Sequence, residues 1–428
     1  MITSLNNNIF AQAYSQTVTL VVQIVTIPFL IYFWGVELFG VWLILTAIPT
    51  YLALSDFGFT FIAKNDMSIH VSAGDKKQAL VTFQSIFILL IIICFTLAIL
   101  LYLLVSLVPF DKLLNIGPVS IESARYVLLI QFFSVLIYQF FLLSCAGLRC
   151  EGMPVLESFL AATGRLLEAI SIILIAGLGG GLVEASLGIL VIRIIFLVIG
   201  IIIIKTKIPW LIYGFTVAKI DRIKELAGPS LSYMLVPMTN ALMIQSPVVI
   251  LGAFSTPATV ALFSVSRTVA RLGMSGANML SYAFTPEYSY AWGAKNIPRF
   301  KKALGYHFKL FSLGFIIYLC ISLLFLTDIV ELLSKGKIEA DFMLCFILSF
   351  AVMLEMLWST LFTPLVSINI HKKLPIVIFF ISLIFISCSY LFHNVISLGI
   401  LMCLANLMIL ICVSKYFKSH PIFDRDAL

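Results

Sequence analysis

Charged residues are scarce in this chain. Asp, Glu, Lys and Arg make up only 11% of its 428 residues, whereas soluble domains carry about 25%. The net charge of +7 is spread along the chain and not gathered in one basic stripe, which excludes a nucleic-acid-binding surface. A chain with so few charges cannot cover a water-facing surface, so a soluble fold is excluded as well.

Cysteine motifs and large polar loops are absent too. The eight cysteines form no CxxC pair and lie near no pair of histidines, which excludes a zinc site or a disulfide framework. Nothing else in the sequence predicts a metal or a cofactor. The longest predicted outer loop, 108–122, offers only Asp111, Lys112 and Glu122. We therefore expect a protein that is not an enzyme, and we set aside a membrane-bound polysaccharide polymerase.

Long hydrophobic runs take the place of charge, because 61% of the residues are apolar. A run of about 20 apolar residues crosses a bilayer as a helix, since lipid leaves irregular backbone unsatisfied. The predicted fold class is all-α integral membrane, with twelve transmembrane helices. The predicted spans are 9–34, 40–63, 79–107, 123–148, 158–178, 184–204, 225–250, 259–284, 303–326, 339–366, 375–392 and 395–414.

Short segments of the first half recur in order in the second half. They pair at offsets near ~220 residues, as in parallel-repeat transporters: 34–42 with 251–263, 76–80 with 301–304, and 152–155 with 373–376. We expect two six-helix bundles, related by a pseudo-two-fold axis along the membrane normal. The predicted parts are 1–207 (first bundle), 208–224 (cytoplasmic linker), 225–414 (second bundle) and 415–428 (cytoplasmic tail).

Basic residues favour one set of loops. One set, with the tail, holds 18 of the 27 Lys and Arg, and the opposite set holds three. Positive charge stays on the cytoplasmic side of a membrane. We therefore expect both termini in the cytoplasm.

Polar residues follow one face of several predicted spans. Gln12, Gln16 and Gln23 repeat at helical spacing in the first span. The eighth span carries Arg267, Arg271, Ser275 and Asn278 on one face, and Asn240 lies in the seventh span. Such faces either join helices through hydrogen bonds or line a cavity, and for the hydroxyl side chains both interpretations stay open.

The two arginines favour a cavity. An arginine at mid-depth costs about 2.5–3.5 kcal/mol, so it needs a partner or water. A water-filled cavity with Arg267 and Arg271 in its wall would bind a phosphate or diphosphate group. Amide side chains beside them would suit sugar hydroxyls. The sequence therefore predicts a substrate site formed by Arg267, Arg271, Ser275, Asn278, Gln12, Gln16, Gln23 and Asn240.

Carboxylates inside the predicted spans are few. Asp56 and Glu355 are candidates for a proton or sodium relay, and each could instead pair with one of the arginines. Arg165 and Glu168 lie three residues apart on one helix face, where they can neutralise each other.

The first 60 residues resemble a known family. Pro28-Phe29-Leu30, the segment from Trp34 to Trp42, and Leu54-Ser55-Asp56-Phe57-Gly58 are similar to the opening of O-antigen flippases. These are polysaccharide transporters of the multidrug/oligosaccharidyl-lipid/polysaccharide exporter superfamily. The resemblance implies a V-shaped pair of bundles with spans 1, 2, 7 and 8 around a central cavity.

The resemblance also implies a function. The expected activity is alternating-access flipping of an undecaprenyl-diphosphate-linked oligosaccharide across the bacterial inner membrane, coupled to protons or sodium, with a polysaccharide polymerase as partner. One alternative is a multidrug or toxin exporter of the same fold, which would need a carboxylate at cavity depth. Another is a peptidoglycan-precursor (lipid II) flippase, which shares the cationic cavity.

Overall fold

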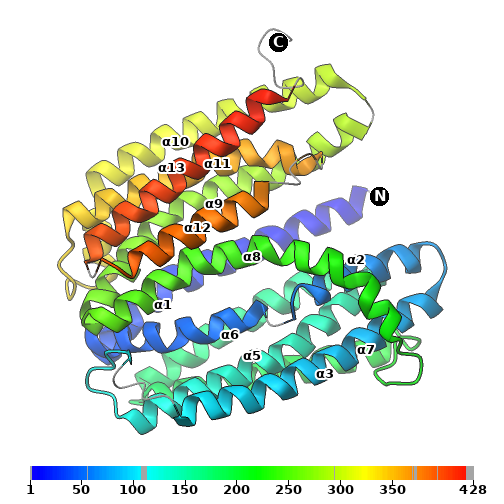
Figure 1. Cartoon of the computed structure of the whole chain (residues 1–428), viewed down its shortest axis with the longest axis horizontal. Helices are drawn as coiled ribbons and strands as arrows, with labels where there is room; N and C mark the ends of the chain where they lie inside the picture. The colour runs from blue at the N-terminus through cyan, green and yellow to red at the C-terminus, as the bar shows by residue number, and fades with distance from the viewer. Residues whose placement is uncertain are drawn as a thin grey trace. The chain divides into compact units, whose positions relative to one another are not determined.

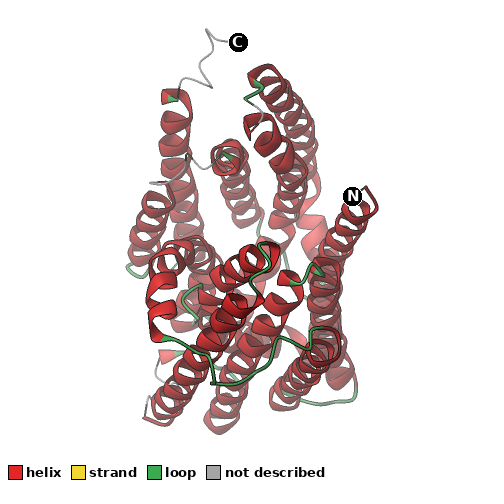
Figure 2. Cartoon of the chain, turned by 90° about the vertical axis from the view of Figure 1, so that its right-hand side faces the viewer, coloured by secondary structure: helices red, strands yellow, loops and turns green. Residues whose placement is uncertain are grey.

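The computed structural model describes residues 2–54, 56–107, 113–293, 295–368, 370, 374–392 and 394–420. Within these residues every regular element is a helix and none is a strand, as Figure 2 shows by colour. The all-α prediction is therefore confirmed. Residues 421–428 of the predicted tail, and Asp111 and Lys112 of the predicted outer loop, lie outside the described residues.

The chain forms two compact units, Met1–Ala241 and Leu242–Leu428. The boundary between them falls within α8, and the predicted partition into bundles 1–207 and 225–414 stays a prediction. The first unit contains α1 (Ile2–Thr50), η1 (Tyr51–Leu54), α2 (Phe59–Ser72), α3 (Lys76–Leu107), α5 (Ile121–Cys150), α6 (Pro154–Gly177), α7 (Leu182–Lys207) and the start of α8 (Ile220–Phe254). The second unit contains the rest of α8 and α9 (Pro257–Gly293), α10 (Ile297–Leu333), α11 (Phe342–Ser367), α12 (Leu374–Ser389) and α13 (Val395–Ser419).

Nine helices of the described chain are long and apolar enough to cross a membrane. The first of them, Ala13–Thr50, contains most of the first predicted span and the start of the second. Two other predicted spans fall outside the nine, because α12 has only 16 residues and α9 is less apolar. In α9, Arg267 and Arg271 lower the hydropathy of a segment that is otherwise apolar. Helix α9, whose hydropathy is too low for the nine, is therefore the one that carries the predicted cationic face.

A glycine divides α1 into its two spans. Gly35 has φ 79° and ψ 171°, which is not helical and which side chains with a Cβ rarely adopt. The indole of Trp34 donates a hydrogen bond to the carbonyl of Gly180, at 2.9 Å, and so holds this break against the α6–α7 connection. The gap of residues 35–39 between the first two predicted spans is too long, because helical residues resume directly after Gly35.

The second predicted span, 40–63, is also interrupted. Helix α1 ends at Thr50, the 3₁₀ turn η1 follows, and α2 begins at Phe59. The carboxylate of Asp56 accepts hydrogen bonds from the amides of Gly58 and Thr60, both at 3.0 Å. An aspartate that binds nearby amides in this way competes with the helical hydrogen bonds. The hydrophobic run therefore predicted the membrane segment but not the break within it.

Each unit has its own hydrophobic core. In the first unit Phe83, Phe141 and Phe196 of α3, α5 and α7 pack together, and these helices lie side by side in Figure 1. In the second unit the core joins Tyr288 and Phe300 to residues of α11, α12 and α13. These cores fix the helices that present the polar side chains described next.

Candidate functional site

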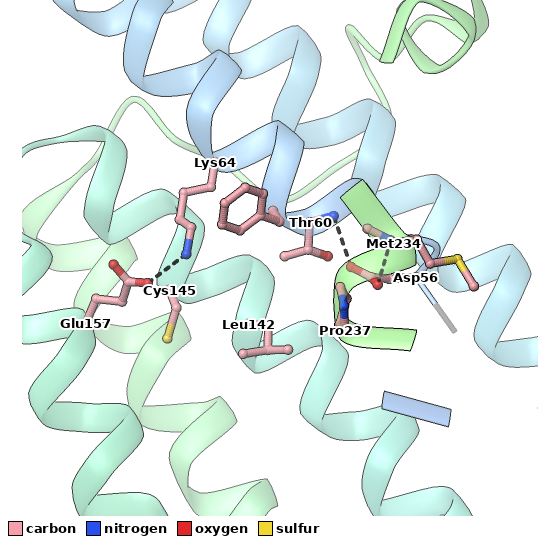
Figure 3. A pocket seen from close by; sticks show the side chains of 10 residues that line it. Asp56, Thr60, Lys64, Leu142, Cys145, Glu157, Met234 and Pro237 are labelled. Carbon is pink, nitrogen blue, oxygen red and sulfur yellow. Dashed lines mark hydrogen bonds and ion pairs between the residues drawn. The ribbon is translucent and has the colours of Figure 1, made fainter. Parts of the chain in front are cut away.

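The first unit contains a partly open cavity of about 240 Å³ next to the break before α2 (Figure 3). Its volume would hold several water molecules, since each takes about 30 Å³ of liquid. The wall combines charged and apolar side chains from α2, α5, α6 and α8. The lining residues are Asp56, Gly58, Thr60, Phe61, Lys64, Leu142, Cys145, Glu157, Met234 and Pro237.

Asp56 lies at one end of this cavity, beside Pro237 and Met234 in Figure 3. Its carboxylate is buried, and its two oxygens accept the amides of Gly58 and Thr60. These two amides, at the start of α2, hold the carboxylate in place. Among the described residues, the buried hydroxyl of Thr60 lines the same cavity and has no hydrogen-bond partner. The role of Asp56 in ion coupling stays a prediction, now with a cavity beside it.

Glu157 lies at the other end of the cavity and binds two cations. Lys64 Nζ is 3.1 Å from its Oε1, and the Nε of Arg149 donates to its Oε2. The carboxylate is therefore held from α2 and from the end of α5 at the same time.

Sequence reasoning missed this cluster because it assigned Lys64, Arg149 and Glu157 to loops. A signal was present, since Asp56, Thr60 and Lys64 follow one another at intervals of four residues. That spacing places Thr60 and Lys64 on one face of α2, the face that lines the cavity.

In the second unit Arg271 of α9 pairs with Glu355 of α11. Two hydrogen bonds join them in parallel, with N–O distances of 2.5 and 3.0 Å. This bidentate arrangement is the strong form of an ion pair between arginine and a carboxylate. The sequence predicts that Glu355 either relays ions or pairs with an arginine, and the structure contains the ion pair. The charge of Arg271 is therefore neutralised by Glu355, and the role of Arg271 in binding substrate stays a prediction.

Arg267 lies one turn before Arg271 and is buried. It donates a hydrogen bond to the carbonyl of Ile244 in α8. Its guanidinium also lies 5.3 Å from the ring centroid of Phe263, a favourable cation–π distance. Ser275 and Asn278 follow on α9 and are half-buried.

The remaining predicted substrate residues belong to the first unit. Gln16 is half-buried and Gln23 is exposed on α1, and Asn240 is exposed on α8. The side chain of Gln12 lies outside the described part of the structure. A common cavity lined by these amides and by the arginines of the second unit stays a prediction.

The predicted neutralisation of Glu168 by Arg165 is wrong. Glu168 pairs with Arg193 of α7, at 2.9 and 3.3 Å, and Arg193 also donates to Ser134 at 2.9 Å. Arg165 instead donates to the hydroxyl of Ser15, at 2.8 Å. Packing of α6 against α7 offers Glu168 a partner on another helix, which sequence spacing cannot reveal.

Solved structures of transporters resemble this chain over nearly its full length. An inward-facing multidrug resistance MATE family transporter of the MOP superfamily aligns with a TM-score of 0.71 and 16% identity, and the match covers 96% of this chain and 98% of that one. The MATE multidrug transporter DinF-BH, solved in complex with a ligand, aligns with a TM-score of 0.69 and 16% identity, over 98% and 96%. The chain has the fold of MATE family transporters.

A third structure shows that this fold accepts a different pocket. It is a MOP superfamily transporter from Pyrococcus furiosus, described as having a binding pocket of reverse polarity that suggests a different function. It aligns with a TM-score of 0.58 and 16% identity, over 97% of this chain and 96% of that one. No protein-family model matches the chain, and no curated protein matches it. The structural neighbours support the predicted superfamily fold but not membership of the O-antigen flippases.

Proposed function

We propose that this chain is a multi-pass membrane exporter that works by alternating access. The observation that carries the proposal is the full-length likeness to MATE family transporters, which extends over 96% of the chain in the inward-facing structure. The nine apolar helices support a position within the bilayer. A transporter of this fold moves cargo when its two halves rock about a central site.

The comparisons favour a multidrug or toxin as cargo over a lipid-linked oligosaccharide. Two of the structural neighbours are described as multidrug transporters, and one of them was solved with a ligand bound. Asp56 is the carboxylate of this chain that best suits a cationic cargo, because it lines a cavity and its described contacts are backbone amides. A multidrug or toxin exporter is therefore the first candidate.

A lipid-linked oligosaccharide is the second candidate, favoured by the ion pairs inside the predicted spans. Glu168 and Glu355 are each held by two hydrogen bonds from an arginine. A carboxylate that is already neutralised attracts an organic cation weakly. A neutral or anionic headgroup, such as a sugar diphosphate, does not depend on a free carboxylate.

Coupling to protons or sodium would involve Asp56 in either case. Its carboxylate lies in the wall of a cavity. The hydroxyl of Thr60 lines the same cavity and has no hydrogen-bond partner among the described residues. A carboxylate and a hydroxyl are ligands that suit a sodium ion or a proton in exchange with water. Glu355 is a weaker candidate, since Arg271 already binds both of its oxygens.

Deletion of the protein in its own cell tests both candidates. If sensitivity to organic cations rises while the lipid extract is unchanged, the multidrug assignment stands. If an undecaprenyl-diphosphate-linked oligosaccharide accumulates and surface polysaccharide is lost, the second candidate replaces the first. If neither changes, and re-expression of the wild-type protein also has no effect on either readout, the exporter proposal is wrong.

A further inference from the structure

The segment that joins α7 to α8 is fastened to the first unit. We call residues 208–219 the connecting segment. The side chain of Gln84 donates to the carbonyl of Ile212, at 3.0 Å, and accepts the amide of Val217, also at 3.0 Å. The hydroxyl of Ser85 accepts the amide of Lys219 at 2.9 Å. The predicted linker is therefore held along α3 by hydrogen bonds.

Packing reinforces these hydrogen bonds. Leu211 of the connecting segment is buried, and it lies against Gly147 of α5. A Cβ on Gly147 would meet Leu211 Cδ2 at only 2.6 Å. The glycine thus permits a close approach of the connecting segment to the first unit.

Arg222, in the first turn of α8, completes the attachment. One of its terminal nitrogens lies 2.6 Å from both carboxylate oxygens of Asp66 and 2.8 Å from Nε2 of His70. Its Nε donates to the hydroxyl of Thr82 at 3.0 Å, and its other terminal nitrogen donates to Glu225 at 2.5 Å. A single side chain therefore ties the start of α8 to both α2 and α3.

The contact with His70 has a defined donor and acceptor. A guanidinium group has hydrogen-bond donors but no acceptor, so in this contact Arg222 donates and Nε2 of His70 accepts. Burial alone would lower the pKa of Arg222, but hydrogen bonds and attraction from Glu225 and Asp66 raise it above its ordinary value. Arg222 therefore keeps its proton and acts as a permanent donor in this cluster.

Protonation of His70 would oppose the attachment. An imidazolium would direct a second donor and a like charge at Arg222 across 2.8 Å. Asp66, whose Oδ1 is 3.7 Å from Nε2, would then attract both cations and be shared between them. Glu225 faces Arg222 from the same turn of α8 and remains its other carboxylate partner. The result is a weaker hold of Asp66 on Arg222.

We propose that His70, Asp66 and Arg222 form a pH-sensitive latch, in which protonation of His70 releases Arg222 and loosens the connecting segment from α3. Histidine is the side chain whose charge changes between pH 5 and 8. The latch lies in the region predicted to face the cytoplasm, so a fall in cytoplasmic pH would free the start of α8. Its effect on transport rests on the proposed exporter function, but the latch itself does not.

Hydrogen–deuterium exchange of the full-length protein in lipid nanodiscs tests the latch. The readout is the protection factor, corrected for the intrinsic rate at each pH, of peptides that contain the Val217 and Lys219 amides. We expect this protection factor to fall about tenfold between pH 8 and pH 6. The reason is that Arg222, a charged group, loses a hydrogen bond that holds the start of α8 and thereby the connecting segment. His70→Gln retains an acceptor that does not titrate, and should keep high protection at both pH values.

Two further variants make the test decisive. His70→Lys is a permanent cation and should show the low protection already at pH 8, whereas the control His420→Gln, in the second unit, should behave as wild type. Equal wild-type protection at both pH values, or an equal fall in His70→Gln, would overturn the latch. Because exchange is measured without cargo, these outcomes are separate from failure of the exporter proposal, which transport measurements show.

Discussion

Two carboxylates, one in each unit, are held in different ways. In the first unit Glu157 binds two cations, Lys64 and Arg149, whereas in the second unit Glu355 binds one arginine through both oxygens. Loss of Lys64 would leave Glu157 with a second partner. Loss of Arg271 would leave Glu355 without its bidentate partner. The shared carboxylate is thus the more tolerant arrangement and the one-to-one pair the more fragile.

The one-to-one pair gives the largest expected effect. Arg271→Met should destabilise the protein by about 3 kcal/mol, because a largely buried carboxylate loses its partner. The measurement is thermal unfolding in detergent. Replacement of both partners by methionine should recover most of the loss, since no charge then stays uncompensated. A double variant no more stable than Arg271→Met would contradict the claim that the cost lies in the uncompensated carboxylate.

The shared carboxylate should respond unequally to loss of its partners. Glu157→Gln leaves two cations facing each other and should cost about 2 kcal/mol. Lys64→Met keeps the Arg149 contact and should cost only about 0.5–1 kcal/mol. The same unfolding measurement compares them. If Lys64→Met proves as damaging as Arg271→Met, the proposed difference between the shared carboxylate and the one-to-one pair does not exist.

Replacement of Asp56 should change ion coupling much more than stability. Asp56→Asn keeps an oxygen that can accept one of the α2 amides, so we expect a stability loss of about 0.5 kcal/mol. Because the variant cannot bind or release a proton, transport should lose its dependence on the ion gradient. The measurement is cargo flux in vesicles with and without an imposed gradient, and Thr363→Val on α11, in the second unit, serves as a control. An Asp56→Asn protein that still responds to the gradient would rule out Asp56 as the coupling residue.

Gly35 should give a small effect on stability and none on the ion pairs. A Cβ at this position meets no atom within 4 Å, so Gly35→Ala is opposed only by its positive φ, at about 1 kcal/mol. Gly276→Ala is a matched control, since it also meets no atom and lies within a regular helix. Equal unfolding temperatures for the two variants would contradict a strained break at Gly35.

Hydrophobic runs predicted the helices better than the contacts between them. Apolar length is a property of one segment, so nearly every predicted span coincides with a helix of the structure. The breaks at Gly35 and Asp56 depend on a single backbone conformation and on a side chain that binds local amides, and a hydropathy window averages over both. The length of an apolar segment therefore predicts the helix but not the breaks within it.

Ion-pair partners were harder to predict. Glu168 had Arg165 nearby in sequence but pairs with Arg193, because helix packing brings α7 to its side of α6. Glu355 and Arg271 lie 84 residues apart and meet only through the packing of α9 and α11. The sequence predicts loops at Lys64 and Glu157, because both residues lie just outside the predicted spans 40–63 and 158–178. Charge at the end of a span therefore predicts local structure poorly.

Reconstitution of the purified protein tests the exporter proposal most directly. Proteoliposomes would carry either a fluorescent organic cation or an extracted lipid-linked oligosaccharide, with an imposed proton or sodium gradient. We predict that at least one cargo crosses the bilayer faster than in protein-free vesicles, and that the gradient accelerates it. If neither cargo moves faster than in protein-free vesicles under any gradient, the chain is not the exporter proposed here.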